Sequence, residues 1–275
     1  MSAFSSVERE RVSHKVSNES FLYLHGLPGS AQAEMTIAFG SCEAPSTIAS
    51  LERLPRLEAA ADYRSAILDA FDQYLERHDQ QKVRLIGFSL GAMPTLHIAA
   101  ARAHNVSSID LIAPGAPLQL GRFLDNMAGR PVFEAASAGK FRLGLLAGLQ
   151  SLGLRLAPNT VALQLFKSAP EIEKSMMAEP IRSEAFTNGM RYAIREHAAG
   201  YRRELNAYVR DWSEILPKVQ SPVRIWQGSA DNWAPPDMAK ALASAIAGPV
   251  QIEWLEGLSH YGTLAHALPR IVKGQ

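Results

Sequence analysis

The sequence has little of several features that mark specialised classes of protein. Its 275 residues include one cysteine, Cys42, so no internal disulfide can form, which suits a reducing compartment. Lys and Arg number 28 against 27 Asp and Glu, and this balance argues against a surface of clustered cations that binds nucleic acid. With 47% hydrophobic and 20% charged residues, the chain is too apolar to be intrinsically disordered.

Long apolar runs are also missing. The most apolar stretch, residues 143–157, is interrupted by Gln150, Ser151 and Arg155 and is too short to span a bilayer. The first residues of the chain are polar and charged and contain no apolar core of a secretory signal. We therefore expect a soluble, cytoplasmic protein without a membrane span or a nucleic-acid partner.

Short apolar segments alternate with longer amphipathic ones, and this alternation predicts an α/β protein with a largely parallel sheet flanked by helices. The expected strands are residues 21–24, 35–39, 83–86, 109–113, 223–226 and 250–255, and the expected helices are residues 60–78, 90–104, 236–247 and 264 onward.

A block of nearly a hundred residues interrupts the alternation. Between residues 115 and 212 the sequence shows no strand pattern, only short helical stretches broken by Gly and Pro. We predict that residues 1–114 and 213–275 form the α/β core, and that residues 115–212 form an inserted helical cap, or lid, over one end of the sheet.

The strongest local motif is Gly87-Phe88-Ser89-Leu90-Gly91, which matches the G-x-S-x-G nucleophile elbow. In an elbow the serine occupies a sharp strand-to-helix turn, and small residues two positions away avoid collisions with the adjoining strand and helix. A bare match can be a simple turn, but here an apolar strand precedes it and a helix-compatible stretch follows it. The context favours Ser89 as a nucleophile at a helix N-terminus.

A serine nucleophile needs a base, and the base needs an orienting carboxylate. Asp231 follows the strand at residues 223–226, and His260 lies between glycines just after the strand at residues 250–255. The alternative for Asp231 is a turn residue that binds its own backbone, and Asp237 is a rival acid in the first turn of a helix. We predict His260 as the base and Asp231 as its partner.

Acyl transfer also needs N–H donors for the negative charge that develops on the carbonyl oxygen. The Leu90 N–H, directly after the nucleophile, is one predicted donor. The Leu27 N–H is the other, because residues 25–30 form a loop with Gly and Pro after the first strand. A turn without a function is the alternative, and a phosphate-binding loop is disfavoured because no Gly-Lys-Ser/Thr follows.

Together, His25-Gly26-Leu27-Pro28-Gly29, the Ser89 elbow, Asp231 and His260 resemble the α/β-hydrolase family, in that family's order. The resemblance runs from about residue 21 to the C-terminus. It implies a mostly parallel sheet of about eight strands, a Ser89–His260–Asp231 triad, and no metal or cofactor. The motifs look most like the esterase, haloperoxidase-like and proline-iminopeptidase-like branch.

Two features depart from the family pattern. Only about 20 residues precede the first expected strand, so we expect the family's opening strands to be shortened or partly missing. After the expected second strand, residues 40–45 replace the usual Gly-x-Gly-x-Ser-like loop, which helps to shape the mouth of the active site. The substrate is therefore left open by this comparison.

Leucines of the expected cap either pack as its own core or line an apolar substrate pocket. Candidates for such a pocket are His25, Phe88, Trp233, Leu145 and Leu149. The predicted function is a cofactor-independent serine carboxylesterase that acts on small or medium apolar esters. Amide or peptide cleavage of the proline-iminopeptidase kind, carbon–carbon bond hydrolysis and a non-catalytic ligand-binding protein are alternatives, and the oligomeric state stays open.

Overall fold

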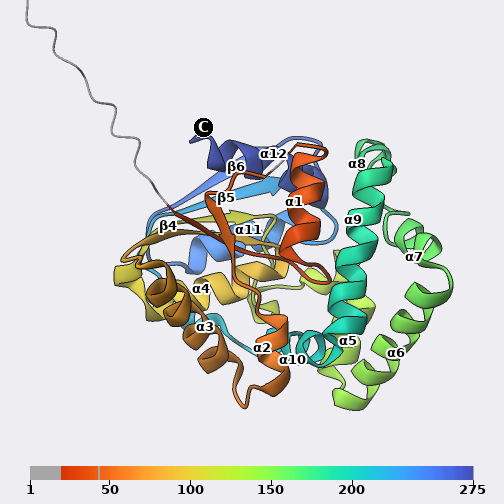
Figure 1. The fold of residues 1–275 in the computed structure, drawn as a ribbon, viewed down its shortest axis with the longest axis horizontal. Helices are drawn as coiled ribbons and strands as arrows, with labels where there is room; N and C mark the ends of the chain where they lie inside the picture. The colour runs from red at the N-terminus through yellow and green to blue at the C-terminus, as the bar shows by residue number, and fades with distance from the viewer. Residues whose placement is uncertain (1–19, 43, 275) are drawn as a thin grey trace, which may run out of the picture.

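Six parallel strands form one sheet in the part of the chain that the structure describes. The structure is a computed structural model that describes residues 20–42 and 44–274, apart from three side chains at 159, 162 and 163. The strands are β1 (Phe21–Leu24), β2 (Ile48–Ser50), β3 (Val83–Phe88), β4 (Val106–Ile112), β5 (Val223–Gly228) and β6 (Val250–Leu255), in the spatial order β2-β1-β3-β4-β5-β6 (Figure 1). The predicted α/β fold with a parallel sheet is confirmed, with six described strands where about eight were expected.

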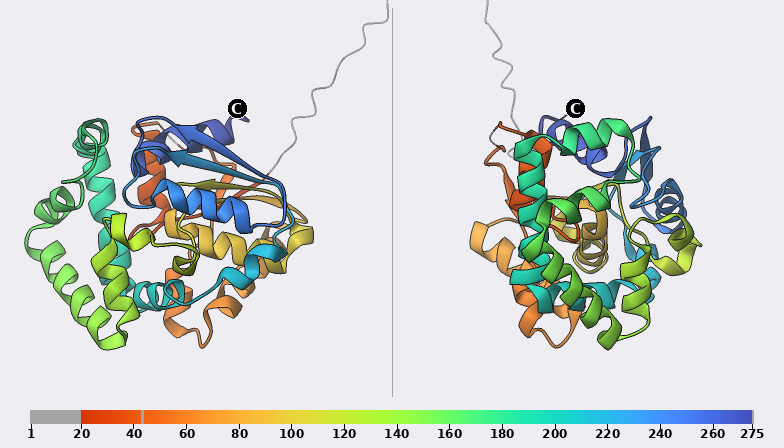
Figure 2. Two further views of the ribbon diagram at one scale, coloured as in Figure 1. Left: turned by 180° about the vertical axis from the view of Figure 1, so that it is seen from behind. Right: turned by 90° about the vertical axis from the view of Figure 1, so that its right-hand side faces the viewer.

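Helices cover both faces of the sheet, which explains why its central strands are almost uniformly apolar. Helices α1 (Ala31–Phe39) and α12 (His260–Val272) pack together on one face. Helices α3 (Tyr63–His78), α4 (Ala92–Ala101) and α11 (Pro236–Ala245) cover the other face (Figures 1 and 2).

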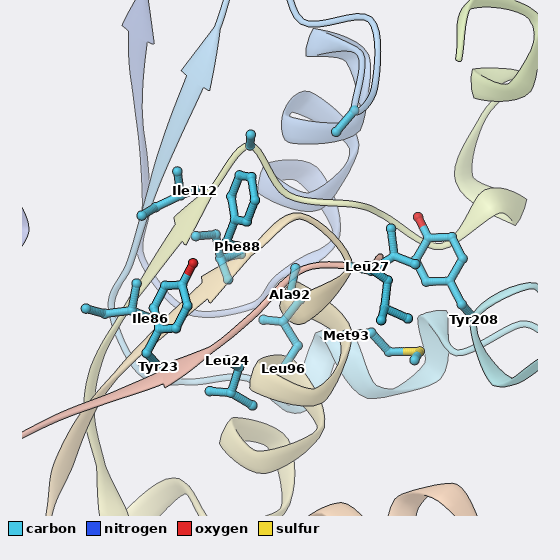
Figure 3. Packing of buried hydrophobic residues seen from close by; sticks show 14 of the residues in the cluster. Tyr23, Leu24, Leu27, Ile86, Phe88, Ala92, Met93, Leu96, Ile112 and Tyr208 are labelled. Carbon is cyan, nitrogen blue, oxygen red and sulfur yellow. The ribbon is translucent and has the colours of Figure 1, made fainter. Parts of the chain in front are cut away.

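Figure 3 shows how the strands and helices share one core. Leu24 of β1 lies beside α4, which contributes Ala92, Met93 and Leu96, whereas Ile86 of β3 points away from α4. All five side chains are essentially inaccessible to solvent. This packing holds the end of β3, and the residue that follows it, in one position.

The prediction of a strand at residues 35–39 is wrong, because these residues form the second half of α1. The Ser30 hydroxyl caps this helix by accepting a hydrogen bond from the Ala33 N–H. A short apolar run does not distinguish a buried helix from a strand. The second strand is the short edge strand β2, and the loop that follows it therefore starts at Leu51 rather than at residue 40.

Residues 115–212, called the helical segment below, contain no strand, as predicted. They lie beside the carboxyl ends of the strands (Figures 1 and 2). Their elements are η3 (Leu118–Leu120), η4 (Phe123–Asn126), α5 (Arg130–Ser137), α6 (Lys140–Leu156), α7 (Pro158–Leu165), α8 (Glu171–Met177), α9 (Pro180–Arg191), the π-helical turn η5 (Tyr192–Glu196) and α10 (Ala198–Tyr208). The 3₁₀ turn η6 (Ser213–Lys218) leads back to β5.

Two contacts hold the helical segment against the rest of the molecule. Helix α9 packs along α1, and α10 packs along α2 (Leu54–Ala59). At the second contact the fully buried Arg53 side chain donates from Nε to the buried Glu204 carboxylate of α10, at 2.8 Å. No helix in the described part of the chain is both long and apolar enough to cross a membrane.

Candidate active site

Ser89 stands at the turn between β3 and α4, with a left-handed backbone conformation (φ 53°). Both glycines of the motif are required because other atoms of the protein lie where a Cβ would stand. A Cβ on Gly91 would lie 2.1 Å from the Leu24 carbonyl oxygen, and one on Gly87 would lie 2.5 Å from the Thr95 hydroxyl. Since no larger residue fits at either position, the local sequence enforces the sharp turn that presents the Ser89 side chain.

His260 and Asp231 reach Ser89 from two other loops at the same edge of the sheet. The His260 Nε2 atom lies 2.9 Å from the Ser89 hydroxyl, and its Nδ1 atom lies 2.8 Å from Asp231 Oδ2. All three side chains are buried. Because an ionised carboxylate only accepts hydrogen bonds, Nδ1 carries the proton and Nε2 can accept the one from serine.

The two oxygens of Asp231 have different partners. Oδ1 accepts hydrogen bonds from the N–H groups of Trp233 and Ala234, at 2.8 and 3.0 Å, which leaves Oδ2 directed at His260. Asp231 therefore both binds the backbone of its own turn and forms the hydrogen bond with His260. The rival acid Asp237 is exposed on the first turn of α11 and pairs with Lys240.

Two aromatic rings hold the imidazole in place. The Trp233 ring stacks on His260 with centroids 5.5 Å apart, and the Phe88 ring lies 4.8 Å away. His260 is the first residue of α12, which begins four residues before the predicted start near 264. Its neighbours Tyr261 and Gly262 donate their N–H groups to the buried Glu173 carboxylate of α8, at 3.4 and 3.3 Å. A carboxylate of the helical segment thus caps the helix that carries His260.

The loop after β1 brings Leu27 into the cavity wall that contains Ser89. Leu27 and Leu90 line the same cavity as Ser89. The Leu27 N–H has no hydrogen-bond partner among the described residues, and Leu90 lies at the start of a helical turn, where N–H groups lack helical acceptors. Both predicted donors are therefore beside the serine.

A buried carboxylate supports this loop from behind. Glu34 of α1 accepts hydrogen bonds from the Gly26 N–H at 2.9 Å and from the Tyr23 hydroxyl at 2.6 Å. Burial raises the pKa of Glu34 to about 8, and the two hydrogen bonds and Arg53 oppose this shift. The sequence gives no indication of Glu34, because the apolar residues 35–39 fit a strand as well as a helix and a lone acid at the edge of an apolar run has no periodic signal.

The cavity over Ser89 has a volume of about 100 Å³, and none of the described residues in its wall is charged. Among the described residues, the polar groups of its wall are the side chains of Ser89, Gln150 and Tyr201 and the indole N–H of Trp233. The core contributes Leu27, Pro28, Ser89, Leu90 and Trp233, and the helical segment contributes Gly129, Val132, Phe133, Gln150, Val161, Leu165, Met190, Ile194, Tyr201 and Leu205.

Of the five pocket candidates, only Trp233 lines this cavity. His25 and Phe88 are buried beneath the site, and Leu145 and Leu149 point outward with 59% and 60% of their surface exposed. The expectation for the two leucines is corrected because α6 directs the opposite face inward. Gln150, on that inward face, was missed because a single polar residue in an apolar helix gives no signal of its direction.

Histidine and carboxylate groups of the site do not form a metal centre. Among residues 20–42 and 44–274, no group of three or more His, Cys, Asp or Glu side chains is placed to hold a metal ion. The His25 Nδ1–H donates a hydrogen bond to the Gly26 carbonyl, and burial lowers the pKa of His25 well below the ordinary value, so its imidazole is neutral. The chemistry that the described side chains can perform is nucleophilic attack with proton transfer.

Comparison with known proteins places the chain in a family. A sequence profile of the Alpha/beta hydrolase family matches residues 23–272, and the chain therefore belongs to the alpha/beta hydrolase family. This membership supports a hydrolase. No curated protein sequence matches the chain significantly.

Solved structures share the fold at low identity. The naproxen esterase (carboxylesterase NP) from Bacillus subtilis is 15% identical, with a TM-score of 0.61 and coverage of 93% of this chain and 81% of that one. A thermophilic esterase from Thermogutta terrifontis is 16% identical, with a TM-score of 0.60 and coverage of 93% and 87%. MenH from S. aureus is 13% identical, with a TM-score of 0.61 and coverage of 94% and 92%.

Proposed function

We propose that this chain is a serine hydrolase that cleaves carboxylic esters with apolar acyl groups and uses no metal or cofactor. The observation that carries the proposal is the unbroken hydrogen-bonded series Ser89–His260–Asp231, which opens onto an apolar cavity. Family membership and the esterases among the structural neighbours agree with it.

In the proposed mechanism, His260 accepts the Ser89 proton as the serine oxygen attacks the ester carbonyl. Asp231 keeps the imidazole in the required tautomer and stabilises its cationic form. The N–H groups of Leu27 and Leu90 hold the negative oxygen of the tetrahedral intermediate. His260 then protonates the leaving alcohol, and water attacks the acyl-enzyme with the same residues in the same roles.

The helical segment acts in this proposal as a cap over the site. It supplies ten of the fifteen residues that line the cavity. A closed volume of about 100 Å³ holds only a small acyl group, since sites for drug-sized ligands are typically several times larger. Medium-sized esters therefore require the cap to move away from Leu27 and Trp233.

The lining also bears on the competing substrates. An aminopeptidase needs an acidic group to bind the free amine of its substrate, and none of the cavity-lining residues that the structure describes is acidic. We therefore place amide and carbon–carbon bond hydrolysis, and a binding protein without activity, among the outcomes to be tested.

The test measures the hydrolysis of p-nitrophenyl esters of increasing acyl length. The proteins compared are the wild type and three single variants, Ser89→Ala, His260→Asn and His266→Asn. His266 lies on the same helix as His260 but does not belong to the hydrogen-bonded series with Ser89 and Asp231, so it serves as a matched control. We expect Ser89→Ala and His260→Asn to lower kcat by at least about 10⁴-fold, and His266→Asn to change it little. Labelling of wild type by a fluorophosphonate probe, lost in Ser89→Ala, would support the nucleophile.

Turnover of the esters that survives in Ser89→Ala would remove this serine from the mechanism. A wild type that neither labels nor turns over any ester would instead favour a binding protein. Labelling without ester turnover would direct the search to amide or carbon–carbon bonds.

A further inference from the structure

Helix α6 presents a row of large apolar side chains to solvent. Phe141, Leu145, Leu149, Leu152 and Leu156 are between 51% and 85% exposed. Their spacings of four, four, three and four residues place them along one side of the helix. We call these five residues the α6 stripe. It contains five of the eight large apolar side chains that are exposed in the described chain.

The stripe is separate from the face of α6 that packs on the protein. Leu143, Ala147 and Leu154 are buried on the inward side, next to Gln150, which lines the cavity. A helix that is apolar on all sides is normally covered on all sides. The fold covers one side of α6 and leaves the stripe without a partner among the described residues.

The charged residues in the segment that contains α6, residues 135–170, all have one sign. Between residues 135 and 170 the sequence contains four cations, Lys140, Arg142, Arg155 and Lys167, and no Asp or Glu. At about 100° per residue, Arg142 lies about 60° to one side of the centre of the stripe and Arg155 about 80° to the other side. None of the three cations of α6 forms an ion pair with a described residue.

We propose that the α6 stripe docks onto the surface of an anionic lipid bilayer, with the axis of α6 parallel to the membrane plane. An in-plane helix with apolar side chains on one face and cations at the borders of that face fits such a surface. The apolar side chains enter the boundary between headgroups and acyl chains. The guanidinium groups of Arg142 and Arg155 extend sideways to lipid phosphates, which their flexible stems allow.

The same charges disfavour a second copy of the chain as the occupant. In a symmetric pair the same patch lies on both copies. The stripe of one copy would then bring Arg142 and Arg155 against the cations of the other, with no acidic residue between positions 135 and 170 to pair with them. An anionic surface satisfies the cations and covers the leucines together.

The test is flotation of the full chain with lipid vesicles, without any substrate, so its result is independent of the proposed esterase activity. Vesicles of phosphatidylcholine alone are compared with vesicles of equal parts phosphatidylcholine and phosphatidylglycerol. We expect binding to the mixed vesicles, a loss of binding at high salt, and much weaker binding to phosphatidylcholine alone.

Two sets of variants separate the apolar and the charged contributions. The triple variant Phe141→Ser, Leu152→Ser and Leu156→Ser should lower the partition coefficient more than about ten-fold. Arg142→Gln and Arg155→Gln should each lower it about five-fold on mixed vesicles and leave it unchanged on phosphatidylcholine. The control Trp254→Ser removes an exposed aromatic side chain on β6 and should leave binding unchanged.

Because all the replaced side chains are exposed, the variants should keep the wild-type melting temperature. Wild-type protein that does not float with the mixed vesicles overturns the proposal, as does an equal loss in Trp254→Ser. If size-exclusion chromatography with light scattering shows a dimer that the triple variant converts to a monomer, and vesicles do not bind, the stripe is a contact between copies instead.

Discussion

The α/β core and the helical segment divide the candidate site between them in different ways. The core supplies the three proposed catalytic side chains, Ser89, Asp231 and His260, from three loops at one edge of the sheet. The helical segment supplies most of the apolar wall above them. In the proposed function, the core therefore carries out the reaction and the helical segment selects the substrate.

The two regions also differ in how completely they bury their apolar side chains. Seven of the eight large apolar side chains that are exposed in the described chain belong to the helical segment, and only Trp254 belongs to the core. A sheet covered by helices on both faces buries its strands from both sides. Helices at the rim of a fold have partners on one side only, so their second face stays open.

The strongest test of these different roles compares Asp231→Asn in the core with Gln150→Ala in the helical segment. Asparagine would stabilise the wrong tautomer of His260, so we expect kcat on an activated ester to fall about 10⁴-fold. Gln150→Ala changes only the cavity wall, and we expect less than about a ten-fold change in kcat/KM, in a direction that depends on acyl length. Steady-state kinetics on both variants measures this. Similar losses in the two variants would contradict the comparison.

Gly91→Ala tests how tightly the core constrains its sequence. The added Cβ would meet the Leu24 carbonyl at 2.1 Å, and neither β1 nor the elbow can move without disturbing the sheet. We expect the free energy of unfolding to fall by about 3 kcal/mol or more. Chemical denaturation checks this, and a variant as stable as the wild type would show that the elbow is less tightly packed than the structure indicates.

Glu34→Gln tests the buried carboxylate behind the Leu27 loop. Between about pH 4.5 and about pH 8 the folded chain keeps a proton on Glu34 that the unfolded chain has released. The free energy of unfolding of wild type should therefore fall as the pH rises through this window, by up to about 1.4 kcal/mol per pH unit from this group. Above about pH 8 both states are ionised and Glu34 adds no further slope.

In Glu34→Gln this slope should disappear, because glutamine does not titrate. Urea denaturation at several pH values across the window measures it, with the exposed Glu256→Gln as the matched control. A Glu34→Gln variant that retains the full wild-type slope would show that other groups cause the dependence.

Gly148→Ala has the smallest expected effect and the opposite sign from Gly91→Ala. Gly148 is exposed within α6, and nothing lies within 4 Å of the position of its Cβ. Alanine should stabilise the helix by about 1 kcal/mol and raise the melting temperature by about 2–4 °C. A decrease in melting temperature would indicate that this side of α6 is packed. It would contradict the conclusion that the helical segment leaves this face exposed while the core is buried.

Much of the fold could be predicted from patterns that stay within one element. The strand β1 is an apolar run, β3 and β5 are mostly apolar, β6 alternates apolar and polar residues, and α3 shows a regular apolar stripe. Short elements could not be predicted correctly, because β2 has three partly exposed residues and the apolar residues 35–39 fit a helix as well as a strand. The elbow was predictable because its steric demands lie within five consecutive residues.

The sequence by itself determined which residue types stand at the ends of the strands: a serine between two glycines, and an aspartate and a histidine after later strands. The steric and hydrogen-bonding requirements of these features involve residues that are close in the sequence, so the features can be inferred without coordinates. Only the tertiary structure decided that Glu34 and Glu173 support the site and that Leu145 and Leu149 face away from it. Burial and the direction of a helical face depend on what packs against the helix, and that partner is distant in the sequence.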